Sequence, residues 1–283
     1  MKELAILIDA FGWAFHHRAI GLKKYLGYGD IFLYTQKEYP DVSQYKRIFQ
    51  FGHHAPAQIP ERTIIHACSF SDFPHLIQTP PKAVCVPNYL LKEHFKSVKS
   101  TLVYLPLTVD ITHFQPYDRN KNDKLKIAFV GNKHRAVKRY YLFDEMRQRM
   151  DDTFTFIETC QKPNRSGGLS YNEMVDFYNE IDVLFSPSKT EGGPYTAFEA
   201  GSCKIPTLIC SKNTGLYNIG IKDRSLFFCD PYVDSIWKTL LDIDKNRDKL
   251  SFVGNNIYDT IITNHSWEAT LGIWKQVLSL LDN

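Results

Sequence analysis

The amino-acid sequence predicts an α/β protein built from two successive series of β-strands and α-helices. Short apolar runs alternate with amphipathic stretches in both halves of the chain, a pattern typical of buried parallel strands connected by helices. A segment rich in proline and polar residues, 106–123, separates the two series. At 283 residues, the chain is long enough for two modest domains.

The first series covers residues 1–110. Strands are expected at 4–8, 31–34, 47–51, 63–67, 83–86 and 102–105. Helices are expected at 16–26 and 88–96, whereas 39–45 and 69–81 have the composition of loops. Alternation of this kind predicts a Rossmann-like domain, and it ends where Pro106, Pro116 and the polar run 117–124 disfavour regular structure.

The second series covers residues 111–264. Strands are expected at 126–130, 154–158, 183–186, 206–210 and 226–228, and helices at 136–150, 171–181 and 194–200. Ser170 and Glu173 have the spacing of a capping box at the start of the helix 171–181. After residue 228 only helices are expected.

Residues 265–283 are expected to form a terminal helix. Ser266 is its candidate N-cap. Helical spacing places seven residues on one face: Trp267, Thr270, Leu271, Trp274, Val277, Leu278 and Leu281. So large an apolar face predicts packing against an extended partner surface.

The composition excludes a disordered or a fibrous protein. Hydrophobic residues make up 43% and charged residues 23%, as in ordinary globular proteins, and the net charge of +3 is too small to indicate a polyanionic partner. The six cysteines form no CxxC pair and are expected to be reduced. The apolar run at 4–8 is too short for a signal or membrane segment, which predicts a cytoplasmic protein without an integral membrane segment.

Candidate ligand-binding chemistry follows the expected strand 183–186. Gly192 and Gly193 lack a Cβ, so a ligand can approach the main chain, and Pro194 suits a first helical turn. The amides of 193–196, which include those of Tyr195 and Thr196, together with the helix dipole favour a diphosphate. The segment therefore predicts a phosphate-binding helix start.

Two glutamates frame this segment, Glu191 before the glycines and Glu199 within the expected helix. They are expected to face different parts of one ligand. The alternative is that both are ordinary capping or solvent-facing carboxylates, because helix starts attract acidic residues in general.

The motifs around these glutamates resemble the retaining glycosyltransferases with the E-x7-E motif (glycosyltransferase family four, group 1 type). The matching segments are Phe185-Ser-Pro-Ser188, Glu191-Gly-Gly193, Phe198-Glu-Ala-Gly201 and Ile205-Pro206. Leu105 to Asp110, followed by Phe114-Gln-Pro116, is similar to the family's interdomain segment, although Thr108 replaces its usual glycine. Tyr178 to Asp182 and Ser266-Trp267 also match, so the resemblance extends over nearly the whole chain.

The resemblance implies a GT-B architecture. Two Rossmann-like domains with parallel sheets are then expected to face a central cleft, and the C-terminal helix to cross back to the N-terminal domain. The first domain, which is unusually short for the family, is expected on the acceptor side. The second, 111–264, is expected to bind the nucleotide sugar, and its two glutamates to hold the sugar hydroxyls (Glu191) and the ribose (Glu199).

A basic loop follows the expected strand 126–130. Its cations Arg135, Lys138 and Arg139 are candidates for stabilising the charge on a departing diphosphate. The family has arginine directly after the glycine, where this chain has Asn132, so which cation acts stays open. The alternative is a solvated basic helix start.

Two positions in the first domain are further candidates. His66 ends the expected strand 63–67, at the sheet edge where such domains bind ligands, and the family places a histidine at a comparable strand end near the transferred sugar. His53 and His54, after the preceding strand, compete with it for this role. Gly12, after the first strand, is a candidate for close approach to the donor.

The resemblance implies glycosyl transfer with retention, and front-face attack is favoured because no carboxylate nucleophile is identified. Asp151-Asp152 has no third acidic partner, so no metal and no cofactor besides the nucleotide-diphosphate sugar are expected. A non-catalytic nucleotide-sugar-binding protein with the same fold remains an alternative. An oxidoreductase is disfavoured, because no G-x-G-x-x-G motif follows the first strand.

The sequence leaves the class of acceptor open. A surface glycan or a lipid-linked sugar is one class, with a peripheral membrane position allowed. Hydroxymethylated pyrimidines in DNA are the other, permitted by basic and aromatic residues in the first domain: Arg18, Lys23, Lys24, Tyr25 and Tyr28. The oligomeric state is also open.

Overall fold

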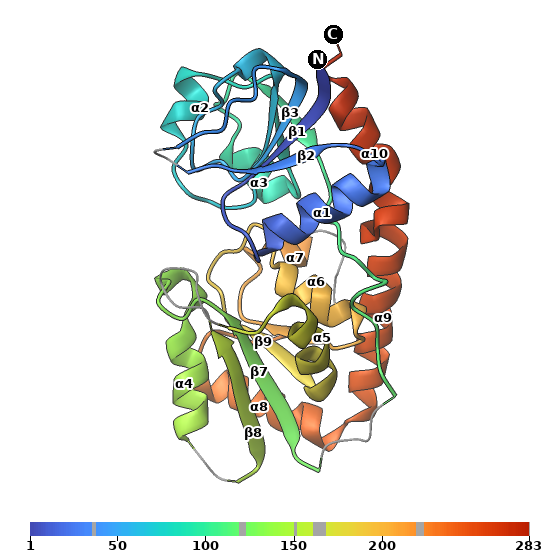
Figure 1. Ribbon diagram of the computed structural model, residues 1–283. Coiled ribbons are helices and arrows are strands. Elements are labelled where there is room, and N and C mark those ends of the chain that lie inside the picture. Colours follow the sequence, from blue (N-terminus) through green and yellow to red (C-terminus); the bar gives the residue numbers. More distant parts are fainter. Residues whose placement is uncertain (36–37, 119–122, 150–151, 161–167, 219–223, 283) are drawn as a thin grey trace. The chain divides into compact units, whose positions relative to one another are not determined.

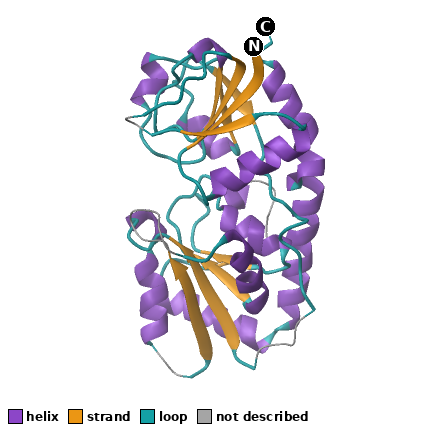
Figure 2. Cartoon of the chain, in the orientation of Figure 1, coloured by secondary structure: helices purple, strands orange, loops and turns teal. Residues whose placement is uncertain are grey.

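The structure, a computed structural model, describes residues 1–35, 38–118, 123–149, 152–160, 168–218 and 224–282. The chain divides into two compact units. Unit 1 consists of Met1–Thr108 and Asn264–Asn283, and unit 2 of Val109–Thr263. Each unit contains one parallel sheet flanked by helices (Figures 1 and 2). The predicted α/β class with two parallel sheets is therefore confirmed.

The sheet of unit 1 has six strands in the order β2-β1-β3-β4-β5-β6, and every pairing is parallel. Its strands are β1 Lys2–Ile8, β2 Asp30–Leu33, β3 Tyr45–Phe51, β4 Thr63–His66, β5 Ala83–Val86 and β6 Thr101–Tyr104. Its helices are α1 Ala14–Leu26, α2 Pro74–Gln78, α3 Tyr89–His94 and α10 Trp267–Ser279, with a 3-10 turn η1 at Pro60–Arg62. Strand order reverses at β1, which makes the loops after β1 and β3 neighbours at the switch point.

Helix α2 lies within the segment 69–81, for which a loop was expected, so that expectation is wrong. Pro74 occupies the first helical turn, where its missing N–H costs nothing. Leu76 is fully buried in a cluster with Phe95 and Val84. Tertiary burial thus stabilises a helix that is too short for its periodicity to be visible in the sequence.

The terminal helix α10 packs onto α1, within unit 1 (Figure 1). Ser266 caps it by accepting a hydrogen bond from the amide of Ala269, as expected. Trp267 and Trp274 are buried, and Gly21 of α1 lies so close to the Trp267 ring that an added Cβ would be 2.5 Å from it. The crossing of the terminal helix back to the first domain is therefore confirmed.

Thr108 anchors this arrangement. Its hydroxyl lies 3.0 Å from the Thr270 hydroxyl and accepts a hydrogen bond from Trp274 Nε1 at 3.1 Å. Both partners are buried. The threonine in place of the family's glycine thus provides an acceptor for the buried Trp274 Nε1, while the Thr270 hydroxyl also donates to the Ser266 carbonyl at 2.8 Å.

The sheet of unit 2 has the order β11-β10-β9-β7-β8, again with parallel pairings. Its strands are β7 Leu125–Gly131, β8 Phe154–Cys160, β9 Val183–Ser186, β10 Thr207–Ile209 and β11 Phe227–Phe228. Its helices are α4 Tyr140–Gln148, α5 Tyr171–Glu180, α6 Tyr195–Ser202, α7 Gly215–Asn218, α8 Val233–Lys245 and α9 Asp248–His265, with a 3-10 turn η2 at Ala136–Lys138. Strand order reverses at β7, so the loops after β7 and β9 flank this switch point.

The expected single helix 136–150 is interrupted, which corrects that prediction. Residues Ala136–Lys138 form the 3-10 turn η2, and α4 begins only at Tyr140. Arg139 between them has a φ of 47°, in the left-handed region. A non-glycine residue there costs of order 1 kcal/mol, so surrounding contacts must hold it in place.

Other boundaries agree closely with the expectation. The capping box of Ser170 and Glu173 is present at the start of α5 and is confirmed. Pro194 is the N-cap of α6 rather than its first residue, and it makes no side-chain capping hydrogen bond. Helix α7 was not foreseen.

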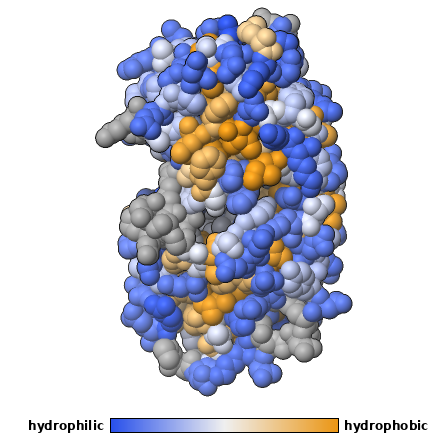
Figure 3. Space-filling model, in the orientation of Figure 1, coloured by the Kyte–Doolittle hydropathy of each residue, from blue (hydrophilic) through white to orange (hydrophobic). Residues whose placement is uncertain are grey.

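The face shown in Figure 3 is mostly polar, with apolar side chains gathered in places. Exposed large hydrophobic residues of the chain include Phe11, Ile20 and Leu33. None of the helices within the described ranges is both long and apolar enough to span a membrane.

Candidate functional site

The switch point of unit 2 brings together the loop after β7, residues 132–139, and the loop after β9, residues 187–194. The amide of Lys189 donates to the carbonyl of Val137 at 2.8 Å, which joins the two loops directly. The hydroxyl of Ser211, after β10, donates to the Lys189 carbonyl at 2.8 Å. Ligands of open α/β sheets bind at this point, outside the carboxyl ends of the strands.

Lys138 and Glu191 meet across these loops. Lys138 Nζ lies 2.5 Å from Glu191 Oε2, and their side chains retain only 15% and 16% of their exposure. The Ser188 hydroxyl donates to the same carboxylate oxygen at 3.3 Å. The main chain of Glu191 is held as well, because its carbonyl accepts from Gly215 N at 2.6 Å. Two of the predicted catalytic residues are therefore in direct contact.

The start of α6 lies directly after Glu191. Gly192, Gly193 and Pro194 are buried, and Tyr195 and Thr196 are partly exposed. Neither glycine has a positive φ, so what they contribute is the absence of a side chain rather than a special backbone conformation. The first amides of a helix have no intrahelical acceptor, and Pro194 offers no capping side chain.

Glu199 lies one to two turns into α6 in different surroundings. Its carboxylate accepts a hydrogen bond from the hydroxyl of Tyr178, at 2.8 Å. Glu199 is partly exposed as a residue, but burial of its carboxyl raises the pKa to about 7, and the Tyr178 bond opposes that rise. The pKa of the fully buried Tyr178 is raised in turn, mainly by its burial. The two glutamates are thus electrostatically distinct.

The three predicted cations of the first loop differ in their surroundings. Lys138 contacts Glu191. Arg139 combines the positive φ with an Nη1 atom that is buried and has no hydrogen-bond partner among the described residues. Arg135 precedes η2, is exposed and forms no ion pair within the described part of the chain.

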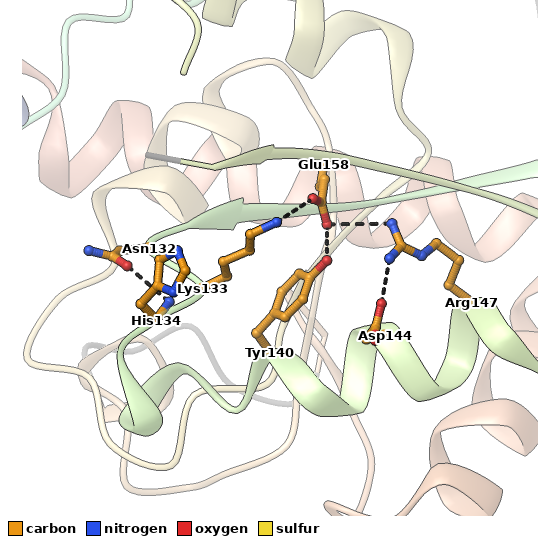
Figure 4. Close-up of polar contacts among 7 residues, drawn as sticks. All are labelled: Asn132, Lys133, His134, Tyr140, Asp144, Arg147 and Glu158. Carbon is orange, nitrogen blue, oxygen red and sulfur yellow. Dashed lines mark hydrogen bonds and ion pairs between the residues drawn. The ribbon is translucent and has the colours of Figure 1, made fainter. Parts of the chain in front are cut away.

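A cluster around Glu158, which the sequence did not single out, anchors this loop (Figure 4). Glu158 Oε1 lies 3.3 Å from Lys133 Nζ, and the Tyr140 hydroxyl donates to Oε2. Arg147 Nη1 lies 3.7 Å from Oε2. In the sequence, the only indication of a role for Glu158 is its position at the end of the expected strand 154–158. The structure places this strand, β8, beside β7, which precedes the basic loop.

Asn132 occupies the position where the family has arginine. Its side-chain oxygen accepts from the His134 amide at 3.0 Å, an Asx turn that bends the chain after β7 (Figure 4). The shifted register of the cations therefore coincides with a turn that Asn132 stabilises.

In unit 1, Gly12 lies in the loop after β1. It is exposed, has a φ of 74°, and its amide donates to His16 Nδ1 at 3.0 Å. An added Cβ would meet nothing within 4 Å, so backbone conformation rather than space requires the glycine.

His66 ends β4 and has no exposed surface in this structure. Its Nδ1 lies 3.4 Å from Nη1 of Arg18 and 3.1 Å from Sγ of Cys68. The pKa of His66 is well below its ordinary value, because of burial and then the Arg18 charge. His53, two residues after the switch-point strand β3, is 1% exposed, whereas His54 beside it is exposed. The predicted contact of His66 with the sugar stays a prediction.

The residues considered for DNA binding differ in exposure. Lys23 and Lys24 are exposed, but Arg18 is 5% exposed and packs over the rings of Phe51 and Trp274. The Tyr25 hydroxyl donates to Glu268 at 2.7 Å.

No group of three or more histidine, cysteine or acidic side chains that could hold a metal ion occurs in the ranges that the structure describes. Asp152 is within these ranges, and its carboxylate pairs with Lys124. Asp151 lies outside them.

The model of the family described as glycosyl transferases group 1 matches residues 109–260. None of the curated proteins matches the chain.

Among solved structures, sucrose-phosphate synthase from Thermosynechococcus elongatus is similar with a TM-score of 0.80, 11% identity and coverage of 98% of both chains. HepE from Anabaena, in complex with UDP and glucose, has a TM-score of 0.76 at 9% identity, covering 99% of this chain and 100% of that one. A glycosyltransferase from Rickettsia africae has a TM-score of 0.75 at 12% identity, covering 99% and 98%. These likenesses confirm the GT-B fold.

Proposed function

The chain belongs to the glycosyl transferases group 1 and is a glycosyltransferase, and from this premise we propose that it transfers a sugar from a nucleotide-diphosphate donor to an acceptor hydroxyl with retention. The observation that carries the proposal is the contact of Lys138 with Glu191 at the switch point, beside the uncapped start of α6. A cation, a carboxylate and helix-start amides at one sheet edge suit a diphosphate attached to a polyhydroxylated sugar.

The diphosphate would lie at the start of α6, against the backbone N–H groups of Gly193, Tyr195 and Thr196. Lys138 and Arg139 would stabilise the negative charge that develops as the bond to the sugar breaks. The buried Nη1 of Arg139 supports this assignment, because a donor with no acceptor among the residues that the structure describes fits a phosphate oxygen. Arg135, being exposed, is the weaker candidate for the same role.

The two carboxylates would divide the donor between them. Glu191, paired with a cation, would accept hydrogen bonds from sugar hydroxyls. Glu199, with its pKa near 7, would hold the ribose hydroxyls from within α6, where it can accept or donate a hydrogen bond. Gly12 would allow close approach of the main chain to the donor, and His66 would contact the transferred sugar.

Retention would follow from front-face attack, in which the acceptor oxygen bonds to the anomeric carbon on the side that the diphosphate leaves. The acceptor proton would pass to the leaving phosphate oxygen. Lys138 and Arg139 supply charge stabilisation of the kind that a metal ion provides in other transferases, so we propose that no metal is needed. Transfer in excess EDTA would then match the untreated rate, and loss of activity restored by a divalent cation would reject this part.

The acceptor class that we propose is a surface glycan or a lipid-linked sugar. The central experiment combines the purified chain with a panel of nucleotide sugars and with glycan, lipid-linked and hydroxymethylated-DNA acceptors. Mass spectrometry would identify the modified acceptor, and NMR of the product would give the anomeric configuration. An inverted product would reject the retaining mechanism, and modified DNA would replace the proposed acceptor.

Variants test the site itself. Glu191→Ala and Glu199→Gln are expected to keep the fold, measured by circular dichroism, while transfer collapses. Glu145→Gln, an exposed carboxylate on α4, is the matched control and should retain full activity. Full activity in both site variants would exclude these roles.

A further inference from the structure

Cys68, which follows β4 in unit 1, has surroundings unlike those of the other cysteines. Its Sγ lies 3.1 Å from Nδ1 and 3.3 Å from Nε2 of His66. The guanidinium of Arg18 contacts the same imidazole at 3.4 Å and interacts electrostatically with the Cys68 sulfur. A sulfur atom, an imidazole and a buried cation are thus clustered at one point.

The cation in this cluster is strongly desolvated. Arg18 is 5% exposed and lies over the rings of Phe51 and Trp274, at 5.3 and 5.6 Å. Burial lowers the pKa of Arg18 to about 10, which still leaves the group charged at neutral pH. A charge in low-dielectric surroundings acts strongly on a neighbouring thiol and favours its ionised form.

The remaining cysteines lack this combination. Cys85, Cys203, Cys210 and Cys229 are buried. Cys160 is partly exposed, as Cys68 is, but it lies beside Glu158, and burial together with that carboxylate raises the pKa of its thiol to about 11. The two partly exposed cysteines therefore differ in their surroundings. Cys68 lies beside Arg18 and His66, whereas at Cys160 burial and Glu158 outweigh the opposing charges of Lys133 and Arg147.

We propose that Cys68 is a modification site, a reactive thiol activated by Arg18 and His66 that hydroperoxides oxidise. The thiol proton leaves to solvent, and the sulfur of the thiolate attacks one peroxide oxygen. The S–O bond forms as the O–O bond breaks, and the departing oxygen takes up a proton. The sulfur is oxidised by two electrons to a sulfenic acid while the peroxide is reduced to water or an alcohol.

Oxidation at this point would alter the contact of Cys68 with His66. Because His66 is predicted to lie near the transferred sugar, sugar transfer is expected to slow when Cys68 is oxidised. This consequence alone rests on the proposed function, whereas the chemistry of the thiol does not.

The experiment exposes the whole chain to limiting hydrogen peroxide at pH 7 and traps sulfenic acid with dimedone. Mass spectrometry of the digested protein then follows Cys68 and Cys160 in the same sample. Cys68 is expected to be labelled at least about tenfold faster than Cys160. Equal rates, or faster labelling of Cys160, would overturn the proposal.

Variants test whether Arg18 and His66 activate the Cys68 thiol. Arg18→Gln is expected to slow labelling of Cys68 several-fold and to leave Cys160 unchanged, whereas Lys23→Gln, an exposed cation on the same helix, should change neither rate. If Arg18→Gln fails to fold, His66→Asn provides the second variant, with the same expected slowing. An unchanged Cys68 rate in the folded variants would reject activation by this cluster.

Discussion

Lys138 Nζ lies 2.5 Å from a carboxylate oxygen of Glu191, although 53 positions separate the two residues in the sequence. The two residues belong to the loops after β7 and β9, which the strand order of unit 2 makes neighbours. The contact therefore follows from the reversal of strand order at β7, where doubly wound sheets bind their ligands.

Removal of this cation should affect both transfer and folding. For Lys138→Met, we expect kcat/KM to fall about 10²- to 10³-fold, as when one donor to a developing negative charge is removed. The free energy of unfolding should also fall, by about 1–3 kcal/mol, because the Glu191 carboxylate would stay largely buried without its cation. Steady-state kinetics and urea unfolding measure the two effects.

Arg135→Met is the matched control for that variant. It removes an exposed cation from the same loop, and its kcat/KM should stay within a few-fold of the wild-type value. A large loss in Arg135→Met with none in Lys138→Met would reverse the assignment.

Glu199 should make stability depend on pH near neutrality. Its pKa in the folded chain is about 7, above the ordinary 4.5. The stabilisation linked to its protonated form is therefore fully present below pH 4.5 and decreases as the pH rises through about 7. Glu199→Gln should remove this decrease, so that its Tm exceeds the wild-type Tm at pH 8 but not at pH 4.5. Parallel pH profiles for the two proteins would contradict the burial of this carboxyl.

His53 should have the opposite effect in unit 1. Burial and the neighbouring histidines lower its pKa from 6.5 to about 3, so the folded state holds it neutral. Its contribution to stability is complete above pH 6.5 and is lost as the pH falls toward 3, by about 2 kcal/mol between pH 6.5 and 5. Urea unfolding of His53→Gln should show a flatter acid limb than the wild type. His134→Gln, which changes an exposed histidine, should keep the wild-type slope.

The packing of α10 on α1 can be tested with two glycines. In Gly21→Ala the new Cβ would lie 2.5 Å from the buried Trp267 ring, so we expect a loss of about 1–3 kcal/mol from overpacking. In Gly272→Ala, on α10 itself, nothing lies within 4 Å, and a gain of about 0.5–1 kcal/mol is expected from helix propensity. Similar unfolding free energies for the two variants would show that the close approach to Trp267 is absent.

Local patterns in the sequence were enough for the strands, for most of the helices and for the family, but not for α2, α7 or the interruption before α4. Apolar runs located the strands, Ser170 and Ser266 located two helix starts, and the segment from Glu191 to Glu199 indicated the class of reaction. These features involve residues close together in the chain, where periodicity, capping and motif spacing operate.

Tertiary structure decided which of these residues act on one another. The Lys138 to Glu191 contact, the hydrogen bonds of Thr108 to the terminal helix and the anchoring of the first loop by Glu158 all join distant segments. The left-handed conformation of Arg139 and the raised pKa of Glu199 likewise depend on neighbours from other elements. The physical reason is that side-chain contacts and desolvation are set by strand order and packing, which no local pattern encodes.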